Sequence, residues 1–201
     1  KGEGARKEKP EHVTETCTGP AKVTFILKLM REILLMDVQA VSGVRRRDSE
    51  IYQLRATTQP DIPRQGVFHH VLHHLLPVSN DNSGGCSELR EKLSEKASWF
   101  LVVLCGRSNE ARRRIISELV IALSLYYDSG SSHESRLLPS RKVLAFVELV
   151  YSVLSKNSSS SSGISVSGYS PDIARSMIDG GIVLRLTGML QSIDLDHPDA
   201  P

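Results

Sequence analysis

The sequence predicts an all-α protein whose helices stack on one another as a segment of an α-solenoid. No segment alternates apolar and polar residues between turn signals, as a half-buried strand would. Residues 143–154 are apolar around almost the whole circumference at about 100° per residue, so this helix needs neighbours on more than one side. Residues 170–190, "SPDIARSMIDGGIVLRLTGML", predict two short helices joined by a glycine turn. Stacked helical repeats meet these requirements.

The glycine turn carries the most specific local pattern in the chain. A sharp turn between two helices needs residues without a Cβ, and Gly180 and Gly181 supply them. Apolar residues then recur at helical spacing, at Ile182, Leu186, Met189 and Leu190. This pattern resembles the passage from the second to the third helix of an armadillo repeat, and it predicts an armadillo/HEAT-like solenoid.

The first 66 residues predict a linker followed by two helices and a break. Residues 1–19 are polar and mixed in charge, which is typical of a disordered segment. Pro20 suits a first helical position, and the helix is expected to run to about Val41. Residues 44–56 form a weaker helix candidate, and Pro63 can start the helix after the break.

Serine residues mark the starts of the later helices. Ser87 begins a predicted helix that reaches Cys105 and ends at Gly106 as a C-cap. Ser108, Ser140 and Ser170 are predicted N-caps. Their helices are expected to run to about Tyr127, to about Lys156 and to the glycine pair, and a last helix is expected from Ile182 to Ile193.

These elements divide the chain into four parts. Residues 1–19 are the linker, 20–128 an irregular helical solenoid block, 129–139 a loop, and 140–201 an armadillo-like repeat. That repeat contains a Ser-rich loop, 157–169, which is expected to be mobile. Because the chain opens in a charged tract and closes as another element begins, we expect it to be part of a longer protein.

Composition gives no sign of a nucleic-acid or membrane partner. The 201 residues are 24% charged and 40% hydrophobic, with a net charge of +2. A charge so close to zero creates no field that would attract nucleic acid or a membrane surface. The three cysteines form no paired motif, which favours a reducing compartment, the cytoplasm or nucleus. No motif calls for a cofactor.

A histidine-rich stretch, "GVFHHVLHHLLP" at residues 66–77, raises the question of a metal site. On an α-helical wheel its apolar residues share one face: Val67, Phe68, Val71, Leu72, Leu75 and Leu76. The opposite face holds all four histidines: His69, His70, His73 and His74. Two i,i+4 pairs result, but each supplies only two ligands and no carboxylate accompanies them, whereas zinc sites take three or four protein ligands. We therefore expect no metal site, but a solvated histidine face or a pH-sensitive contact surface.

Two arginine triplets, 45–47 and 112–114, are the other notable clusters. Arg112, Arg113 and Arg114 lie in the first turn of a predicted helix, where they oppose the macrodipole. Arg114 can pair with Glu118 at i,i+4. The triplet is interpreted either as a solvated face or as a contact for an acidic partner or another part of the same chain.

No residue of the chain is a predicted catalytic group. Cys17 lies in the linker beside acidic residues, which would raise rather than lower a thiol pKa. Cys86 follows a flexible loop, and Cys105 sits in the apolar run "WFLVVLCG", typical of a buried inert thiol. The chain also lacks a phosphate-binding glycine loop and a nucleophile elbow.

Several long segments of the sequence resemble the armadillo-like region of the very large plant HECT-type ubiquitin ligases. They include "LREKLSEKASWFLVVLCGRSNEARRRIISELVIALS" and "LLPSRKVLAFVELVYSVLSKNSSS", and the resemblance covers nearly all of residues 21–201. It implies a parent enzyme that carries ubiquitin on a cysteine of a distant C-terminal HECT domain. None of Cys17, Cys86 and Cys105 matches the motif around that cysteine. Protein substrates, neighbouring repeats and a ubiquitin-conjugating enzyme acting through the HECT domain are the implied partners.

Two functions from different classes follow. The first is a non-catalytic solenoid scaffold that frames substrates for the ligase. The alternative is an independent armadillo-type adaptor that binds peptides along a ladder of Asn and Trp residues. The chain has one tryptophan, Trp99, expected in the core, and no recurring Asn ladder, which disfavours the adaptor.

Overall fold

A computed structural model of the chain describes residues 11–58, 65–77, 87–129, 140–156 and 170–191. Within these ranges the chain is helical and holds no strand, which confirms the all-α prediction. The elements are α1 (Glu11–Met36), α2 (Val38–Thr58), α3 (Val67–His70), the π-helical segment η1 (Val71–Leu75), α4 (Ser87–Arg107), α5 (Asn109–Ser129), α6 (Arg141–Lys156), α7 (Pro171–Asp179) and α8 (Ile182–Leu190).

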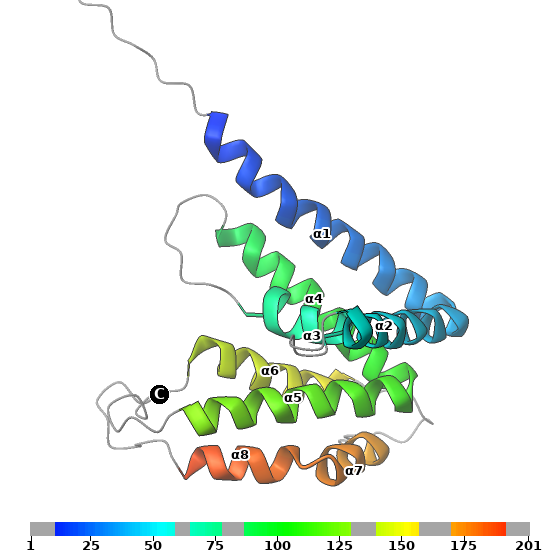
Figure 1. Ribbon diagram of the computed structural model, residues 1–201, viewed down its shortest axis with the longest axis vertical. Coiled ribbons are helices and arrows are strands. Elements are labelled where there is room, and N and C mark those ends of the chain that lie inside the picture. Colours follow the sequence, from blue (N-terminus) through cyan, green and yellow to red (C-terminus); the bar gives the residue numbers. More distant parts are fainter. Residues whose placement is uncertain (1–10, 59–64, 78–86, 130–139, 157–169, 192–201) are drawn as a thin grey trace, which may run out of the picture.

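The helices form a stack, with α1 at one end and α7 and α8 at the other (Figure 1). Helix α1 packs mainly against α4, and α4 in turn contacts α5 and α6. Helices α7 and α8 cover α5 at the opposite end of the stack from α1 (Figure 1). The short α3 sits between α2 and α5, so it joins the N-terminal helices to the middle of the stack. Among the described helices, none has the length and apolar character needed to cross a membrane.

One apolar core runs through the stack from α1 to α8. Its largest fully buried side chains include Phe68 of α3, Phe100 of α4 and Phe146 of α6. Because Phe68 belongs to a segment of only a few residues, burial of this ring fixes α3 and η1 against the longer helices. The histidines of the same segment are thereby held at the α5 and α6 surface.

The first helix differs from its predicted boundaries at both ends. Helix α1 begins at Glu11, so Pro20 lies inside it rather than at its first position. A long helix can carry one proline at the cost of one backbone hydrogen bond. The helix ends at Met36, not near Val41, because Asp37 breaks it and accepts the Gln39 N–H through Oδ1 at 2.8 Å. The weak candidate at 44–56 is confirmed as part of α2.

The predicted caps of the later helices are partly confirmed. The hydroxyl oxygens of Ser108 and Ser140 accept backbone N–H bonds from Ala111 and Val143, at 3.2 and 3.4 Å. Ser170 caps α7 through its backbone carbonyl alone. The prediction that Gly106 ends α4 is wrong, because the helix continues to Arg107.

The glycine turn between α7 and α8 is confirmed in its backbone geometry. Gly181 has a φ of +85°, a left-handed conformation that favours glycine. Gly180 approaches α5 so closely that a Cβ would lie 2.4 Å from Cγ2 of Ile116. The two glycines thus serve different purposes, one for the turn and one for the contact.

The prediction that α6 is covered on nearly all sides is wrong for the described residues. Leu144, Val147 and Tyr151 are 46%, 38% and 63% exposed, while Val143 and Phe146 are buried. The helices of this chain cover one face of α6 and leave the other to solvent. Pro63, the loop 157–169 and residues 192–201 lie outside the described residues, as do residues 1–10 of the predicted linker.

Candidate functional site

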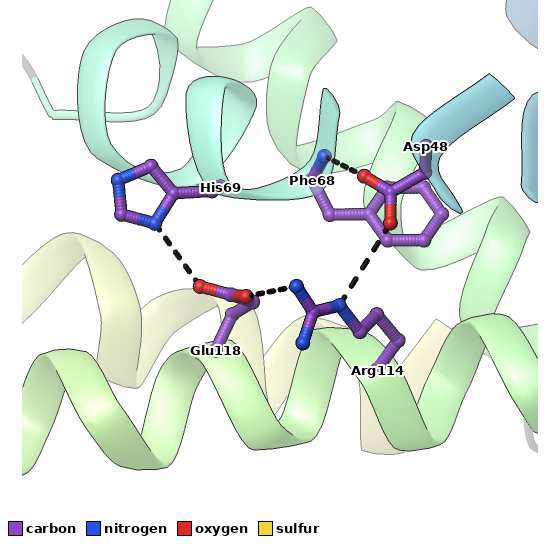
Figure 2. Close-up of polar contacts among 5 residues, drawn as sticks. All are labelled: Asp48, Phe68, His69, Arg114 and Glu118. Atoms are coloured by element: carbon purple, nitrogen blue, oxygen red, sulfur yellow. Dashed lines mark hydrogen bonds and ion pairs between the residues drawn. The ribbon is translucent and has the colours of Figure 1, made fainter. Parts of the chain in front are cut away.

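The candidate site is a buried polar network where α2, α3 and α5 meet (Figure 2). It links Asp48 of α2, Phe68 and His69 of α3, and Arg114 and Glu118 of α5. Asp48 and Glu118 are among the three charged residues that are buried in the described part of the chain. Buried charges are costly unless they are paired, so their partners define what the site can do.

Asp48 fastens α2 to the start of α3. Its Oδ1 accepts the backbone N–H of Phe68 at 3.0 Å, and Oδ2 lies 3.8 Å from Nε of Arg114. The side chain is 3% exposed, and burial raises the pKa of its carboxyl; the bond from Phe68 and the Arg114 charge oppose this shift. Gly66 lies so close that a Cβ there would stand 2.2 Å from Oδ1 of Asp48.

Arg114 and Glu118 form the ion pair that their i,i+4 spacing predicted. Nη2 of Arg114 donates to Oε1 of Glu118 at 2.8 Å, and the guanidinium lies 4.5 Å from the ring centre of Tyr52. Glu118 is 4% exposed and the Arg114 side chain 30%, so the pair joins a buried carboxylate to a partly exposed guanidinium. Oε1 is occupied by arginine, which leaves Oε2 facing α3.

Two histidines complete the network on the α3 side. Nδ1 of His69 lies 3.1 Å from Oε2 of Glu118, and the His69 ring stacks on that of His73 with centroids 4.1 Å apart. The His73 ring also meets the edge of Phe146, at 5.8 Å between centroids. Its Nε2 atom is buried and has no hydrogen-bond partner among the described residues.

The pKa of His73 is lowered to about 4. Burial is the largest cause, and the charges of His69, Lys142 and His74 add to it. The ring is therefore neutral at neutral pH, and its nitrogen lone pair stays available.

The prediction that all four histidines face away from the core is wrong for His69 and His73. Both are partly buried, whereas His70 and His74 are exposed and lie on the outer side with ring centroids 5.0 Å apart. The wheel assumed an α-helix, but residues 71–75 are π-helical, with Leu76 N–H bonded to the Val71 carbonyl. The π-turn changes the position of His73 relative to the wheel. His69 comes before this turn, and it is partly buried because Glu118 of α5 packs against it.

The three arginines of the 112–114 triplet lie in three different environments. Arg112 is buried and donates to the Cys105 carbonyl at 2.9 Å and to the Ser176 hydroxyl at 3.2 Å. Arg114 belongs to the network above, so both meet other parts of the same chain, one of the alternatives the sequence left open. Arg113 is exposed and lines a groove between α5 and α7, together with Arg175.

Sequence reasoning paired Glu118 with Arg114 but missed its contact with the histidines, and it missed Asp48 altogether. Glu118 keeps the helical spacing of Ala111, Ile115 and Ala122, which are all buried. An acidic residue in phase with an apolar stripe is the signal that could have identified it. Asp48 follows buried Val41 at i+7 in the same way.

The one described cysteine side chain is unsuited to catalysis. Cys105 is 1% exposed, and burial raises its pKa to about 12. A thiol so placed is neither ionised nor accessible near neutral pH. Cys17 and Cys86 lie outside the residues whose side chains the structure describes.

Fold and site together define a helical, solenoid-like segment with a buried polar junction. The sequence is 55% identical to the E3 ubiquitin-protein ligase UPL2 of Arabidopsis thaliana over 197 residues, which is 96% of this chain. It is 56% identical to the E3 ubiquitin-protein ligase UPL1 of the same plant over 185 residues, 90% of the chain. The resemblance to a region of the large plant HECT-type ubiquitin ligases is therefore confirmed.

The match covers only a small part of either relative. The chain spans 5% of the length of UPL2 and 5% of that of UPL1. No family model matches the chain, and none of the solved structures matches it.

Proposed function

We propose that the chain is a non-catalytic scaffold segment of a HECT-type E3 ubiquitin-protein ligase that frames substrates for a catalytic domain elsewhere in the parent protein. The observation that carries the proposal is identity of 55–56% over 90–96% of the chain to a region of two E3 ubiquitin-protein ligases. The chain belongs, on this proposal, to the cytoplasm or nucleus, where buried free thiols such as that of Cys105 persist.

The fold supports a scaffold role for this segment, with catalysis in another domain. A stack of helices presents long exposed faces, such as Leu144, Val147 and Tyr151 of α6, that another protein can cover. The glycine turn between α7 and α8 favours an armadillo-like plan for this stack. Partners are then protein substrates and neighbouring repeats, while a ubiquitin-conjugating enzyme acts through the distant HECT domain.

The adaptor alternative finds less support. Trp99, expected in the core, is partly buried, and its ring is contacted by Arg31 and Lys156, each at 4.3 Å from the ring centre. Two cations already occupy the ring, so it offers no open ladder position for a peptide.

A thioester assay tests whether the chain is catalytic. The 201-residue chain is mixed with a ubiquitin-charged conjugating enzyme, and products are compared with and without a thiol reductant. We expect no reducible ubiquitin adduct. An adduct on Cys17, Cys86 or Cys105 would contradict the proposal.

A second assay tests the scaffold role in the parent ligase. Leu144→Glu/Tyr151→Glu changes the exposed face of α6 without touching the buried one. We expect the parent ligase to form its own ubiquitin thioester at the unchanged rate while fewer proteins in cells become ubiquitinated. The control is Ser42→Glu/Ser49→Glu at exposed positions of α2. An unchanged set of ubiquitinated proteins would argue against this face as a substrate surface.

A further inference from the structure

We propose that His69, His73 and Glu118 form a Zn²⁺ site that clamps the α3–η1 segment to α5. One ring nitrogen of each histidine and one carboxylate oxygen of Glu118 all lie within 4.8 Å of one another. Two histidines and a carboxylate are a known zinc ligand set that leaves a fourth position for water. The structure thus supplies the third ligand that the histidine spacing alone lacks.

The unsatisfied histidine nitrogen is the independent sign of a missing ligand. Nε2 of His73 is buried without a hydrogen-bond partner among the described residues. A buried nitrogen without a partner is unfavourable, and an absent ion or water is among the few explanations for it.

Glu118 has one carboxylate oxygen in position to meet a cation. Glu118 divides its two oxygens, because Oε1 takes the Arg114 guanidinium at 2.8 Å and Oε2 faces His69. Arg114 therefore orients the carboxylate without blocking the oxygen that would meet the metal. Arg114 lies beside both Asp48 and Glu118, and the charge of Lys142 acts on His73, so the ionic surroundings of the site contain both signs.

Small side-chain movements would bring the ligands to bonding distance. Tetrahedral zinc holds its ligand atoms at about 2.0–2.2 Å from the metal, hence roughly 3.4 Å from one another. Nδ1 of His69 and Oε2 of Glu118 are already 3.1 Å apart. The stacked His73 ring is therefore the group that has to move. His73 belongs to a π-helical turn, the kind of local irregularity often found at functional sites.

Titration of the chain with zinc tests the site. The 201-residue chain is stripped with a chelator and titrated with ZnCl₂ in a calorimeter, and we expect one Zn²⁺ per chain. His69→Gln, His73→Gln and Glu118→Gln should each weaken the affinity by about tenfold or more. The matched control is His70→Gln/His74→Gln, an exposed i,i+4 pair on the outer side, which should change the affinity by less than about twofold, since it removes no ligand.

Two outcomes would overturn the proposal. One is a stripped wild-type chain that takes up no zinc, and the other is binding that depends on His70 and His74 but survives loss of His69 and His73. Circular dichroism checks that the variants fold. Cobalt(II) bound to the wild-type chain gives a measurement independent of variants: a strong visible spectrum of a tetrahedral ion supports the site, and the pale spectrum of an octahedral ion contradicts it.

Discussion

At the scale of single residues, Gly66 shows how one missing side chain makes room for a buried charge. A Cβ at this position would lie 2.2 Å from Oδ1 and 2.8 Å from Cγ of Asp48. Asp48 cannot retreat without losing its bond to the Phe68 N–H. The glycine is therefore needed for close approach, since its backbone has an ordinary extended conformation.

Gly66→Ala should consequently destabilise the chain by about 1–3 kcal/mol through overpacking. The free energy of unfolding from urea titration, followed by circular dichroism, measures the effect. Gly43→Ala in the interior of α2 is the matched control, because a Cβ there meets nothing within 4 Å. That change should stabilise by roughly 0.5–1 kcal/mol. Equal effects of both substitutions would refute the role of close approach.

Cys105 is the second residue whose environment makes a measurable difference. Burial raises its pKa to about 12, so the native thiol stays protonated while an unfolded thiol begins to ionise near pH 8.5. Its contribution to the free energy of unfolding therefore decreases as the pH rises above about 8.5. We expect iodoacetamide at pH 8 to alkylate Cys105 in urea but not in the native chain. Peptide mass spectrometry measures both, and rapid native alkylation would be inconsistent with the buried position.

At the scale of elements, Arg112 connects three helices through one guanidinium. It donates to the Cys105 carbonyl in α4, to Asn109 at the start of its own helix α5, and to Ser176 in α7. Because these acceptors surround a buried cation, removal of the cation leaves polar groups unsatisfied as well as losing the bonds. Its neighbour Arg113 is exposed and offers a comparison within the same turn.

Arg112→Met should therefore lower the free energy of unfolding by roughly 2–3 kcal/mol. Arg113→Met should change it by less than about 0.5 kcal/mol, as is usual for surface positions. Arg112→Lys should restore only part of the loss, since an ammonium cannot match the planar fork of the guanidinium. Chemical denaturation of the three variants decides the matter, and similar values for Arg112→Met and Arg113→Met would show that the junction is energetically unimportant.

Helix boundaries and caps could be predicted where local chemistry decides them. Ser108 and Ser140 are examples, because a hydroxyl before an apolar run needs no tertiary information. The break at Asp37 also has a local cause, since its carboxylate accepts the N–H two residues on, but this signal was not recognised. The π-turn at residues 71–75 could not be predicted, because tertiary packing can override local helix signals. The candidate site was missed for the same reason: Glu118 is far from the histidines in sequence, and only the fold brings it to His69.

At the scale of the whole molecule, the two ends of the stack carry uncovered apolar side chains. Helix α1 exposes Phe25, Ile26, Leu29, Ile33 and Met36, and α8 exposes Val183, Leu184 and Leu190. In a solenoid such faces are buried by the next repeat. The chain spans 5% of the length of the ligases it matches. If it is the ligase segment proposed above, other segments of that ligase are expected to cover these faces.

Val183→Glu/Leu190→Glu should then have opposite effects in two contexts. In the 201-residue chain, where both side chains are exposed, it should leave stability within about 0.5 kcal/mol and reduce self-association seen by sedimentation. In a longer piece of the parent that continues past residue 201, it should lower Tm by several degrees, because the charges would enter a packed interface. Ser42→Glu/Ser49→Glu controls for added charge at exposed positions of α2. An identical response in both contexts would mean that no neighbouring repeat packs on α8.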